Sequence, residues 1–196
     1  MILDSFKWFN VSEMTIEGDK ITIFAPRMTD FFNNPVPEDG KIQEPVANAP
    51  YFYTDWEGDF VARVLVQPTF LTDYDAASLF LYQNEKIWVK LAFEKSDFDT
   101  TAIVSVITNN VSDDANGCNI NQDSVWLQMA RVGNNIILHY SLDGEKYDLV
   151  RIAALPLERT IKIGIESQCP TGEGVNNSFY NFTIEKRTIS NLRKGE

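Results

Sequence analysis

The chain has 196 residues, of which 44% are hydrophobic and 12% are aromatic, and this composition predicts a globular domain and excludes a disordered chain. The formal net charge is −11, and basic residues cluster only in the short run 187–194, so the basic footprint of a nucleic-acid-binding protein is missing. An acidic surface also disfavours anionic membranes. We therefore expect neither a nucleic acid nor a membrane as a partner.

The first residues show no basic segment followed by an apolar run, and no apolar stretch reaches the length of a membrane span. The sequence therefore predicts a cytoplasmic protein. Its two cysteines, Cys118 and Cys169, are expected to be free thiols in that compartment.

Runs of alternating apolar and polar residues recur along the chain, as half-buried β-strands require. In chain order they cover residues 14–17, 20–24, 60–67, 87–94, 101–108, 125–130, 136–142, 146–152 and 161–166. No segment shows helical periodicity with capping residues. The pattern therefore predicts an all-β protein.

Turn-forming residues separate these runs. Gly18-Asp19 follows the first run, and Gly133-Asn134-Asn135 separates two later ones. Asp143-Gly144 predicts a two-residue type I′ hairpin, and residues 95–100 should join the strands on either side. Because the connections are short, neighbouring strands are expected to be antiparallel.

Two longer segments, residues 26–50 and 109–123, are rich in Asn and Asp and are expected to be irregular loops. Neither resembles a linker between domains. About a dozen short strands with regular turns are typical of a two-sheet antiparallel sandwich or jelly roll. We therefore expect residues 1–196 to form a single domain.

Several short motifs occur in an order that resembles one known family. They are Thr29-Asp30-Phe31-Phe32, Gly58-Asp59-Phe60, Tyr74-Asp75-Ala76-Ala77-Ser78-Leu79, Trp88-Val89-Lys90 with Glu94, Ser105-Val106-Ile107-Thr108 with Ser112-Asp113, Tyr140-Ser141-Leu142-Asp143-Gly144 and Pro170-Thr171-Gly172-Glu173-Gly174. From about residue 20 to residue 185, the chain resembles the YesU-type family of uncharacterised domains, which also includes the regulation-of-enolase proteins. The resemblance implies a jelly-roll sandwich of the concanavalin A-like lectin/glucanase type.

The resemblance implies no defined reaction, and the chain departs from the family pattern at three positions. Ala76 stands where the family has Gln, Ser78 where it has Gly, and Asp114 where it has Trp. Relatives of this fold bind or cleave glycans, but a fold does not fix a function.

Trp88, Lys90 and Glu94 share one face of their predicted strand, and Ile87, Val89, Leu91 and Phe93 form the apolar face that should meet the core. An indole covers the apolar face of a pyranose ring, and charged groups bond to its hydroxyls. These three residues are therefore candidate saccharide ligands. The alternative is a solvated face with a Lys–Glu pair and a Trp covered by a loop.

Thr108 and Asp113 are further candidates for ligand binding. If strands 87–94 and 101–108 pair, Thr108 lies beside Trp88, and Asp113 should lie at the rim of the same face. Ser112, Asp30 and Asp75 fit local turn bonding better than ligand binding. The Asp and Asn residues of 113–119 match no Ca²⁺ loop, and the single His139 forms no zinc pattern, so we expect neither a metal nor a cofactor.

The leading hypothesis is a domain that binds a carbohydrate or sugar derivative on one face of a sheet. One alternative is a sugar-active enzyme in which Glu94 is the acid or base and Lys90 stabilises its carboxylate. Another is a protein-interaction module that uses the aromatic face around Trp88. The sequence leaves the ligand, the oligomeric state and any catalysis open.

Overall fold

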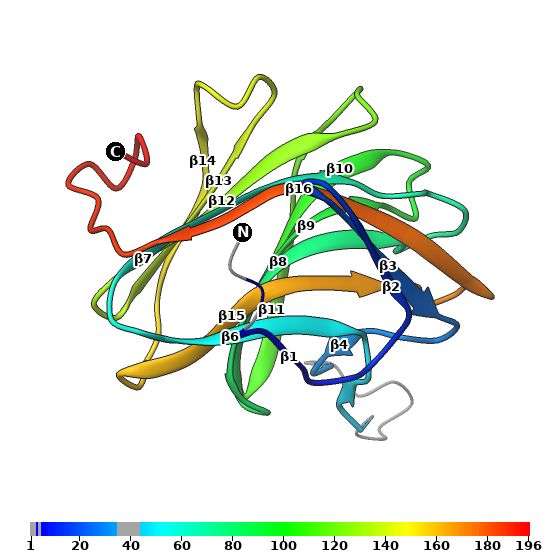
Figure 1. Ribbon diagram of the computed structural model, residues 1–196, viewed down its shortest axis with the longest axis horizontal. Coiled ribbons are helices and arrows are strands. Elements are labelled where there is room, and N and C mark those ends of the chain that lie inside the picture. The colour runs from blue at the N-terminus through cyan, green and yellow to red at the C-terminus, as the bar shows by residue number, and fades with distance from the viewer. Residues whose placement is uncertain (1–2, 4, 35–43) are drawn as a thin grey trace.

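The computed structural model describes residues 3, 5–34 and 44–196. Two seven-stranded antiparallel sheets face each other as a sandwich (Figure 1), so the predicted all-β, two-sheet architecture is confirmed. The first sheet has the order β1 (Lys7–Trp8), β6 (Tyr51–Glu57), β15 (Thr160–Gln168), β8 (Ala76–Asn84), β9 (Ile87–Lys95), β10 (Thr101–Asn109) and β11 (Val111–Asn119).

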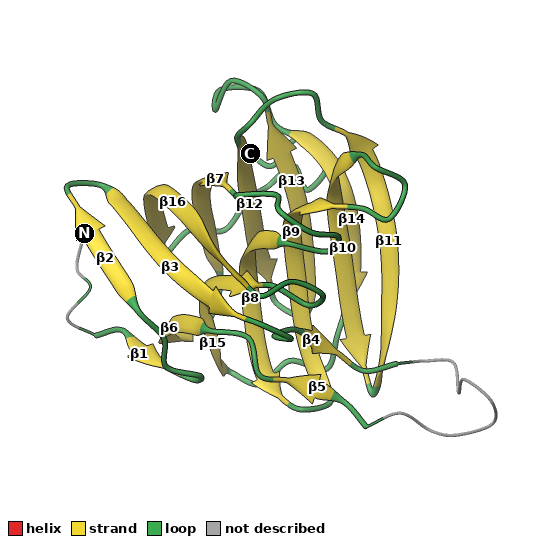
Figure 2. Cartoon of the chain, turned by 90° about the vertical axis from the view of Figure 1, so that its right-hand side faces the viewer, coloured by secondary structure: helices red, strands yellow, loops and turns green. Residues whose placement is uncertain are grey.

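The second sheet has the order β14 (Asp148–Ala154), β13 (Asn135–Ser141), β12 (Val125–Val132), β7 (Phe60–Gln67), β16 (Gly174–Glu185), β3 (Lys20–Pro26) and β2 (Met14–Glu17). A separate two-stranded ribbon pairs β4 (Phe31–Phe32) with β5 (Val46–Ala47) (Figure 2). The described part of the chain contains no helix that is long and apolar enough to cross a membrane.

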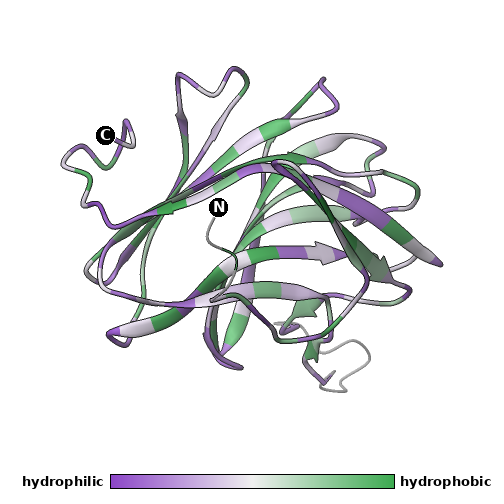
Figure 3. Ribbon diagram, in the orientation of Figure 1, coloured by the Kyte–Doolittle hydropathy of each residue, from purple (hydrophilic) through white to green (hydrophobic). Residues whose placement is uncertain are grey.

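The main core lies between the two sheets, where alternate residues of each strand point inward. Val89, Leu91 and Phe93 are fully buried in this core, as the apolar face of β9 predicts. Hydrophobic residues recur along the strands of both sheets in Figure 3. Trp8 of β1 packs on Phe52 with ring centroids 5.0 Å apart, so the N-terminal strand packs against the sandwich.

A second apolar layer covers the outer face of the first sheet, the face turned away from the second sheet. It contains Phe31 from β4, Tyr51 from β6, Phe80 from β8 and Trp88 from β9. The rings of Phe31 and Phe80 lie 4.6 Å apart, and those of Phe80 and Trp88 lie 5.5 Å apart. The first sheet is therefore buried on both faces in this region, with Phe31 as part of the cover.

Two sequence-based expectations about loops are wrong. Residues 109–123 are not an irregular loop, because β11 pairs with β10 along most of that segment. Asp143-Gly144 is not a two-residue type I′ hairpin, because β13 ends at Ser141 and β14 begins only at Asp148. In the longer turn, Oδ1 of Asp143 accepts hydrogen bonds from the backbone N–H groups of Glu145 and Lys146.

The segment 26–50 is also more regular than the irregular loop that the sequence predicts. Residues 26–50 contain β4 and β5, while positions 35–43 of that segment lie outside the described residues. Both Cys118 and Cys169 are free thiols.

Candidate functional site

The buried ammonium group of Lys90 is the centre of a polar cluster on the outer face of the first sheet. Its Nζ donates to Oδ1 of Asp30 at 2.8 Å, to Oε1 of Gln168 at 2.6 Å and to the carbonyl of Phe31 at 3.2 Å. An ammonium has three N–H donors, so these three acceptors satisfy it completely. The cluster joins β9 and β15 to the segment that enters β4.

Strand register brings the members of this cluster together. Ala76 of β8 pairs with Gln168 on one side and with Glu94 on the other, so these two side chains share the outer face. The amide of Gln168 donates to the carbonyl of Tyr74 at 2.8 Å and to Oε2 of Glu94 at 3.3 Å. Gln168 therefore links Lys90 to Glu94 and to the loop before β8.

Three carboxyl groups surround Lys90 and change how it ionises. Burial alone would lower the pKa of Lys90, but the attraction of Asp30, Glu166 and Glu94 outweighs burial and raises the pKa above its ordinary value. Lys90 is therefore a permanent cation at neutral pH.

For Glu94 and Glu166, burial outweighs the attraction of Lys90, and their pKa values rise. Burial raises the pKa of Glu94 to about 8 against the attraction of Lys90, and it raises the pKa of Glu166 to about 7. The Glu166 carboxyl group is fully buried. Glu94 is therefore mainly protonated at neutral pH, contrary to the expectation that Lys90 would hold it as a carboxylate.

A pocket of about 280 Å³ opens over this cluster. Its lining combines acidic and amide groups with apolar and aromatic ones: Asp30, Phe32, Tyr74, Lys90, Glu94, Val104, Val106, Asp114 and Gln168. A small cavity with apolar walls and a few convergent polar groups is typical of a small-molecule site. Of the five sequence candidates, Lys90 and Glu94 line it.

Trp88 lies on the predicted face of β9, but its side chain is only 1% exposed and does not line the pocket. The ring of Phe31 covers it, with the two ring centroids 6.2 Å apart. The indole therefore has no free face for a sugar or for a protein partner. The sequence left two interpretations of Trp88 open, a saccharide ligand and a Trp covered by a loop. The structure agrees with the second.

Thr108 pairs with Trp88 across β9 and β10, as expected from the hairpin. It is fully buried, and its hydroxyl lies 2.9 Å from that of Ser112. Ser112 Oγ also accepts a hydrogen bond from the backbone N–H of Asn33 at 2.9 Å. Thr108 therefore takes part in an internal contact and does not line the pocket.

Asp113 lies outside the pocket, and its neighbour Asp114 lines it. Asp113 pairs with Ile107 of the core face, and its carboxylate bonds to Arg151 at 3.0 Å. Asp114 pairs with Val106, which lines the pocket. Because β11 is a strand, successive side chains point to opposite faces, so the predicted residue Asp113 faces away from the pocket and Asp114 faces it.

Asp75 has a structural role, as expected. Its carboxylate accepts hydrogen bonds from the backbone N–H groups of Leu71 and Thr72, at 3.0 and 2.7 Å. Tyr74, directly before it, has a φ of 69°, a conformation that is uncommon for non-glycine residues. The ordered turn places Tyr74 at the pocket.

Besides Asp114 and the apolar wall of Val104 and Val106, sequence reasoning missed four lining residues as ligand candidates. They are Asp30, Phe32, Tyr74 and Gln168. The first three lie within the motifs that carry the family resemblance, and this was the available signal. Gln168 lies next to the last predicted alternating run and in none of those motifs. Only the pairing of β15 with β8 places it beside Glu94.

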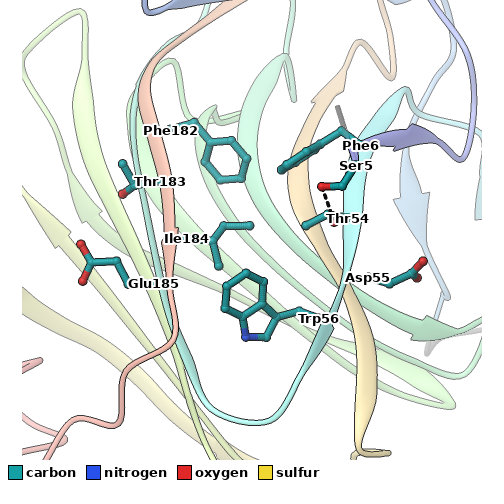
Figure 4. Close-up of a pocket in the computed structure, with 9 residues that line it drawn as sticks. All are labelled: Ser5, Phe6, Thr54, Asp55, Trp56, Phe182, Thr183, Ile184 and Glu185. Carbon is teal, nitrogen blue, oxygen red and sulfur yellow. Dashed lines mark hydrogen bonds between the residues drawn. The ribbon is translucent and has the colours of Figure 1, made fainter. Parts of the chain in front are cut away.

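A larger cavity of about 630 Å³ lies away from this cluster (Figure 4). Phe182 and Ile184 of β16 face Trp56 of β6 and Phe6 across it. Its polar groups are largely engaged, because the hydroxyls of Ser5 and Thr54 lie 3.2 Å apart and Asp55 pairs with Lys7 at 2.8 Å. Its described lining contains no basic side chain, whereas the pocket over Lys90 combines a buried ion pair with amide and carboxyl groups. Among the described residues, no group of three or more His, Cys, Asp or Glu side chains is arranged to hold a metal ion.

Comparison with known proteins places the chain in a family. The sequence pattern of the family described as "Protein of unknown function (DUF1349)" matches residues 8–187. The chain belongs to the DUF1349 family. It is also 24% identical over 179 residues to "Regulation of enolase protein 1" of Saccharomyces cerevisiae, covering 90% of the chain and 87% of that protein. The family resemblance seen in the motifs is thereby confirmed.

Solved structures confirm the concanavalin A-like sandwich for this DUF1349 domain. A functionally unknown protein from Saccharomyces cerevisiae superposes with a TM-score of 0.84 at 22% identity, covering 95% of the chain and 98% of that protein. Lectin I-B4 from Griffonia simplicifolia superposes with a TM-score of 0.60 at 8% identity, with 94% of each chain covered. The GH43 protein BlXynB from Bacillus licheniformis gives 0.65 at 11% identity, with 93% of this chain but only 39% of that protein covered. At these identities the likeness shows the fold alone.

Proposed function

We propose that the pocket over Lys90 binds a saccharide or a sugar derivative. The observation that carries this proposal is the cluster of Lys90, Asp30 and Gln168, which fixes polar groups at a pocket that Glu94 and Asp114 also line. Groups held by buried hydrogen bonds lose little entropy when a ligand binds, so such a pocket is preorganised. The lectin and GH43 neighbours support the proposal, because the same fold carries sugar-related proteins.

The aromatic surface that would contact a sugar ring comes from Phe32 and Tyr74, which line the pocket, in place of Trp88. Val104 and Val106 add an apolar wall from β10. An aromatic or aliphatic surface covers the C–H face of a sugar ring, while carboxyl and amide groups bond to its hydroxyls. The lining therefore supplies both kinds of contact within one small volume.

A binding measurement with matched variants tests the proposal. Neutral monosaccharides are titrated into the ¹⁵N-labelled chain at pH 7, and we expect shifts confined to the residues of the pocket. Tyr74→Ala should weaken binding at least tenfold, whereas Phe98→Ala removes an aromatic ring of similar size that is exposed and outside the pocket lining, and it should have no effect. If no sugar shifts the pocket resonances, or if both variants behave alike, the proposal fails.

A sugar-active enzyme is a second candidate, favoured by one observation. Glu94 lines the pocket and burial raises its pKa to about 8, so it holds a proton at neutral pH as a general acid must. Turnover of aryl glycosides that disappears in Glu94→Gln and persists in Glu173→Gln, an exposed glutamate, would support this candidate. Absence of turnover with every glycoside that the pocket binds would leave binding as the function.

A further inference from the structure

If the pocket binds a sugar as proposed, the charges around it indicate whether that sugar is neutral or anionic. Among the described residues that line it, Lys90 is the one cation. All three of its N–H donors are directed at protein acceptors, namely Asp30, Gln168 and the carbonyl of Phe31. Its ammonium group therefore has no donor left for the carboxylate or phosphate of a ligand.

The amide of Gln168 is similarly engaged. Its oxygen accepts from Lys90, and its nitrogen donates to the Tyr74 carbonyl and to Glu94. It therefore cannot replace Lys90 as a donor to an anion without breaking an internal hydrogen bond. Recognition of a sugar acid or phosphate normally uses charge-assisted donors such as Arg or Lys, and this lining offers none that is free.

The remaining polar side chains of the lining are mostly acids. Asp30, Glu94 and Asp114 contribute carboxyl groups from three different segments of the chain. Carboxyl oxygens accept hydrogen bonds from sugar hydroxyls, and a protonated carboxyl group or a phenol such as Tyr74 can also donate one. At neutral pH Glu94 is mainly protonated and the charge of Asp30 is balanced by Lys90, so the like charge that a ligand anion would face comes from Asp114. Because the lining offers no free cationic donor to offset that charge, an anion is disfavoured.

We infer that the pocket takes an uncharged, hydroxyl-rich sugar and excludes sugar acids and sugar phosphates. The volume of about 280 Å³ lies just below the usual range for small-molecule sites, about 300 to 1,000 Å³, and suits a single ring better than an extended chain. Anions are thus excluded because the N–H donors of Lys90 are all engaged by acceptors of the protein.

Matched sugars test this inference. Glucose, galactose and xylose are titrated against glucuronate, galacturonate and glucose 6-phosphate at pH 7 and low salt, with binding followed by NMR. We expect at least one neutral sugar to bind, and its anionic counterpart to bind at least ~100-fold more weakly. An anionic sugar that binds as tightly as its neutral counterpart, or more tightly, would overturn the inference and leave the proposed function standing. Failure of all six sugars would count against the proposed function itself.

Adjacent aspartates provide the matched variants. Asp114→Asn removes a charge from the lining, so it should raise the affinity for the anion relative to the neutral sugar by about tenfold. Asp113→Asn removes the same charge from the neighbouring residue, which points to the other side of β11 and pairs with Arg151, and it should leave that ratio unchanged. If Asp114→Asn leaves the ratio unchanged as well, the lining charges do not set the selectivity and the inference is wrong.

Discussion

The ammonium nitrogen of Lys90 lies 2.8 Å from Oδ1 of Asp30, and this ion pair joins residues that are 60 positions apart in the sequence. Asp30 immediately precedes Phe31, whose ring covers Trp88 and whose carbonyl accepts from the same ammonium group. This ion pair thus holds in place both Phe31, which covers the outer apolar layer, and Lys90, which lines the pocket. The stability of this region and its capacity to bind a ligand are therefore coupled.

Replacing Lys90 by Met should lower the free energy of unfolding by about 3 to 5 kcal/mol, because it leaves the largely buried carboxylate of Asp30 without its cation. Urea unfolding at pH 7 measures this loss. Lys7→Met is the control, since Lys7 forms an ion pair of the same 2.8 Å length with Asp55 while both side chains are largely exposed. Equal losses in the two variants would mean that the Lys90 cluster contributes no more than a surface ion pair.

The raised pKa values of Glu94 and Glu166, about 8 and about 7, predict an unusual dependence of stability on pH. In the unfolded chain these groups release their protons near pH 4.5, whereas the native state keeps them until pH 7 to 8. Between these values the native state binds more protons, so the stability contribution of these groups is largest below about pH 4.5 and falls as pH rises. Each group should lower stability by up to ~1.4 kcal/mol per pH unit in that window.

Chemical denaturation at intervals from pH 5 to pH 8 checks this prediction. Glu94→Gln keeps the shape of the side chain and removes its titration, so its stability should decline less steeply than that of the wild type. Glu173→Gln, whose side chain is 86% exposed in the wild type, should reproduce the wild-type slope. A Glu94→Gln profile parallel to the wild type would show that Glu94 ionises normally.

Nine strands of this fold match the predicted runs because alternation is a local signal, whereas β6, β8 and β16 match none of them. Alternation along β9 is sufficient to assign Val89, Leu91 and Phe93 to the core and Lys90 and Glu94 to the other face. Alternation does not predict β11, because this strand lies at the edge of the sheet and most of its residues are polar and exposed. Without a strand assignment, nothing in the sequence tells which of Asp113 and Asp114 faces the pocket.

The burial of Trp88 is not predictable from its own strand. A Trp on the outer face of a sheet has the same local pattern whether it is open or covered, and the cover here comes from Phe31, more than fifty residues earlier in the chain. The same holds for Gln168, whose position depends on the register between β15 and β8. Local patterns assign faces, whereas long-range packing decides which side chains on a face remain accessible.

The revised role of Trp88 leads to a prediction about binding. Because Trp88 does not line the pocket, Trp88→Phe should change sugar affinity by less than about threefold in the folded protein, although loss of ring volume from a packed layer should cost about 1 to 3 kcal/mol of stability. Phe32→Ala changes a lining residue and should weaken binding by more than tenfold. Calorimetric titration at a temperature where both variants are folded separates the effects. If Trp88→Phe lost binding while Phe32→Ala bound normally, the indole of Trp88 would be the group that contacts the sugar ring, contrary to this prediction.

The packing of the C-terminal segment on the second sheet should weaken at acid pH, because of His139. Ile189 and Leu192 pack on an apolar patch that includes Val61, and His139 is fully buried beside this segment. Nε2 of His139 lies 3.3 Å from the Arg193 carbonyl, and its Nδ1 lies 3.4 Å from Nε2 of Gln128. In the neutral tautomer that fits these partners, Nε2–H donates to the carbonyl and Nδ1 accepts from the amide.

Protonation of Nδ1 would place two N–H donors against each other, and Gln128 cannot relieve this by turning its amide because its oxygen already accepts from Arg63 at 2.6 Å. Burial lowers the pKa of His139, so the unfolded chain binds this proton first and stability is lost as pH falls below about 6.5. Hydrogen exchange of residues 187–196, corrected for the intrinsic effect of pH, should therefore show several-fold weaker protection at pH 5 than at pH 7. His139→Gln removes the titration and should flatten this difference. Equal protection of the segment at both pH values in the wild type would show that the buried imidazole does not control it.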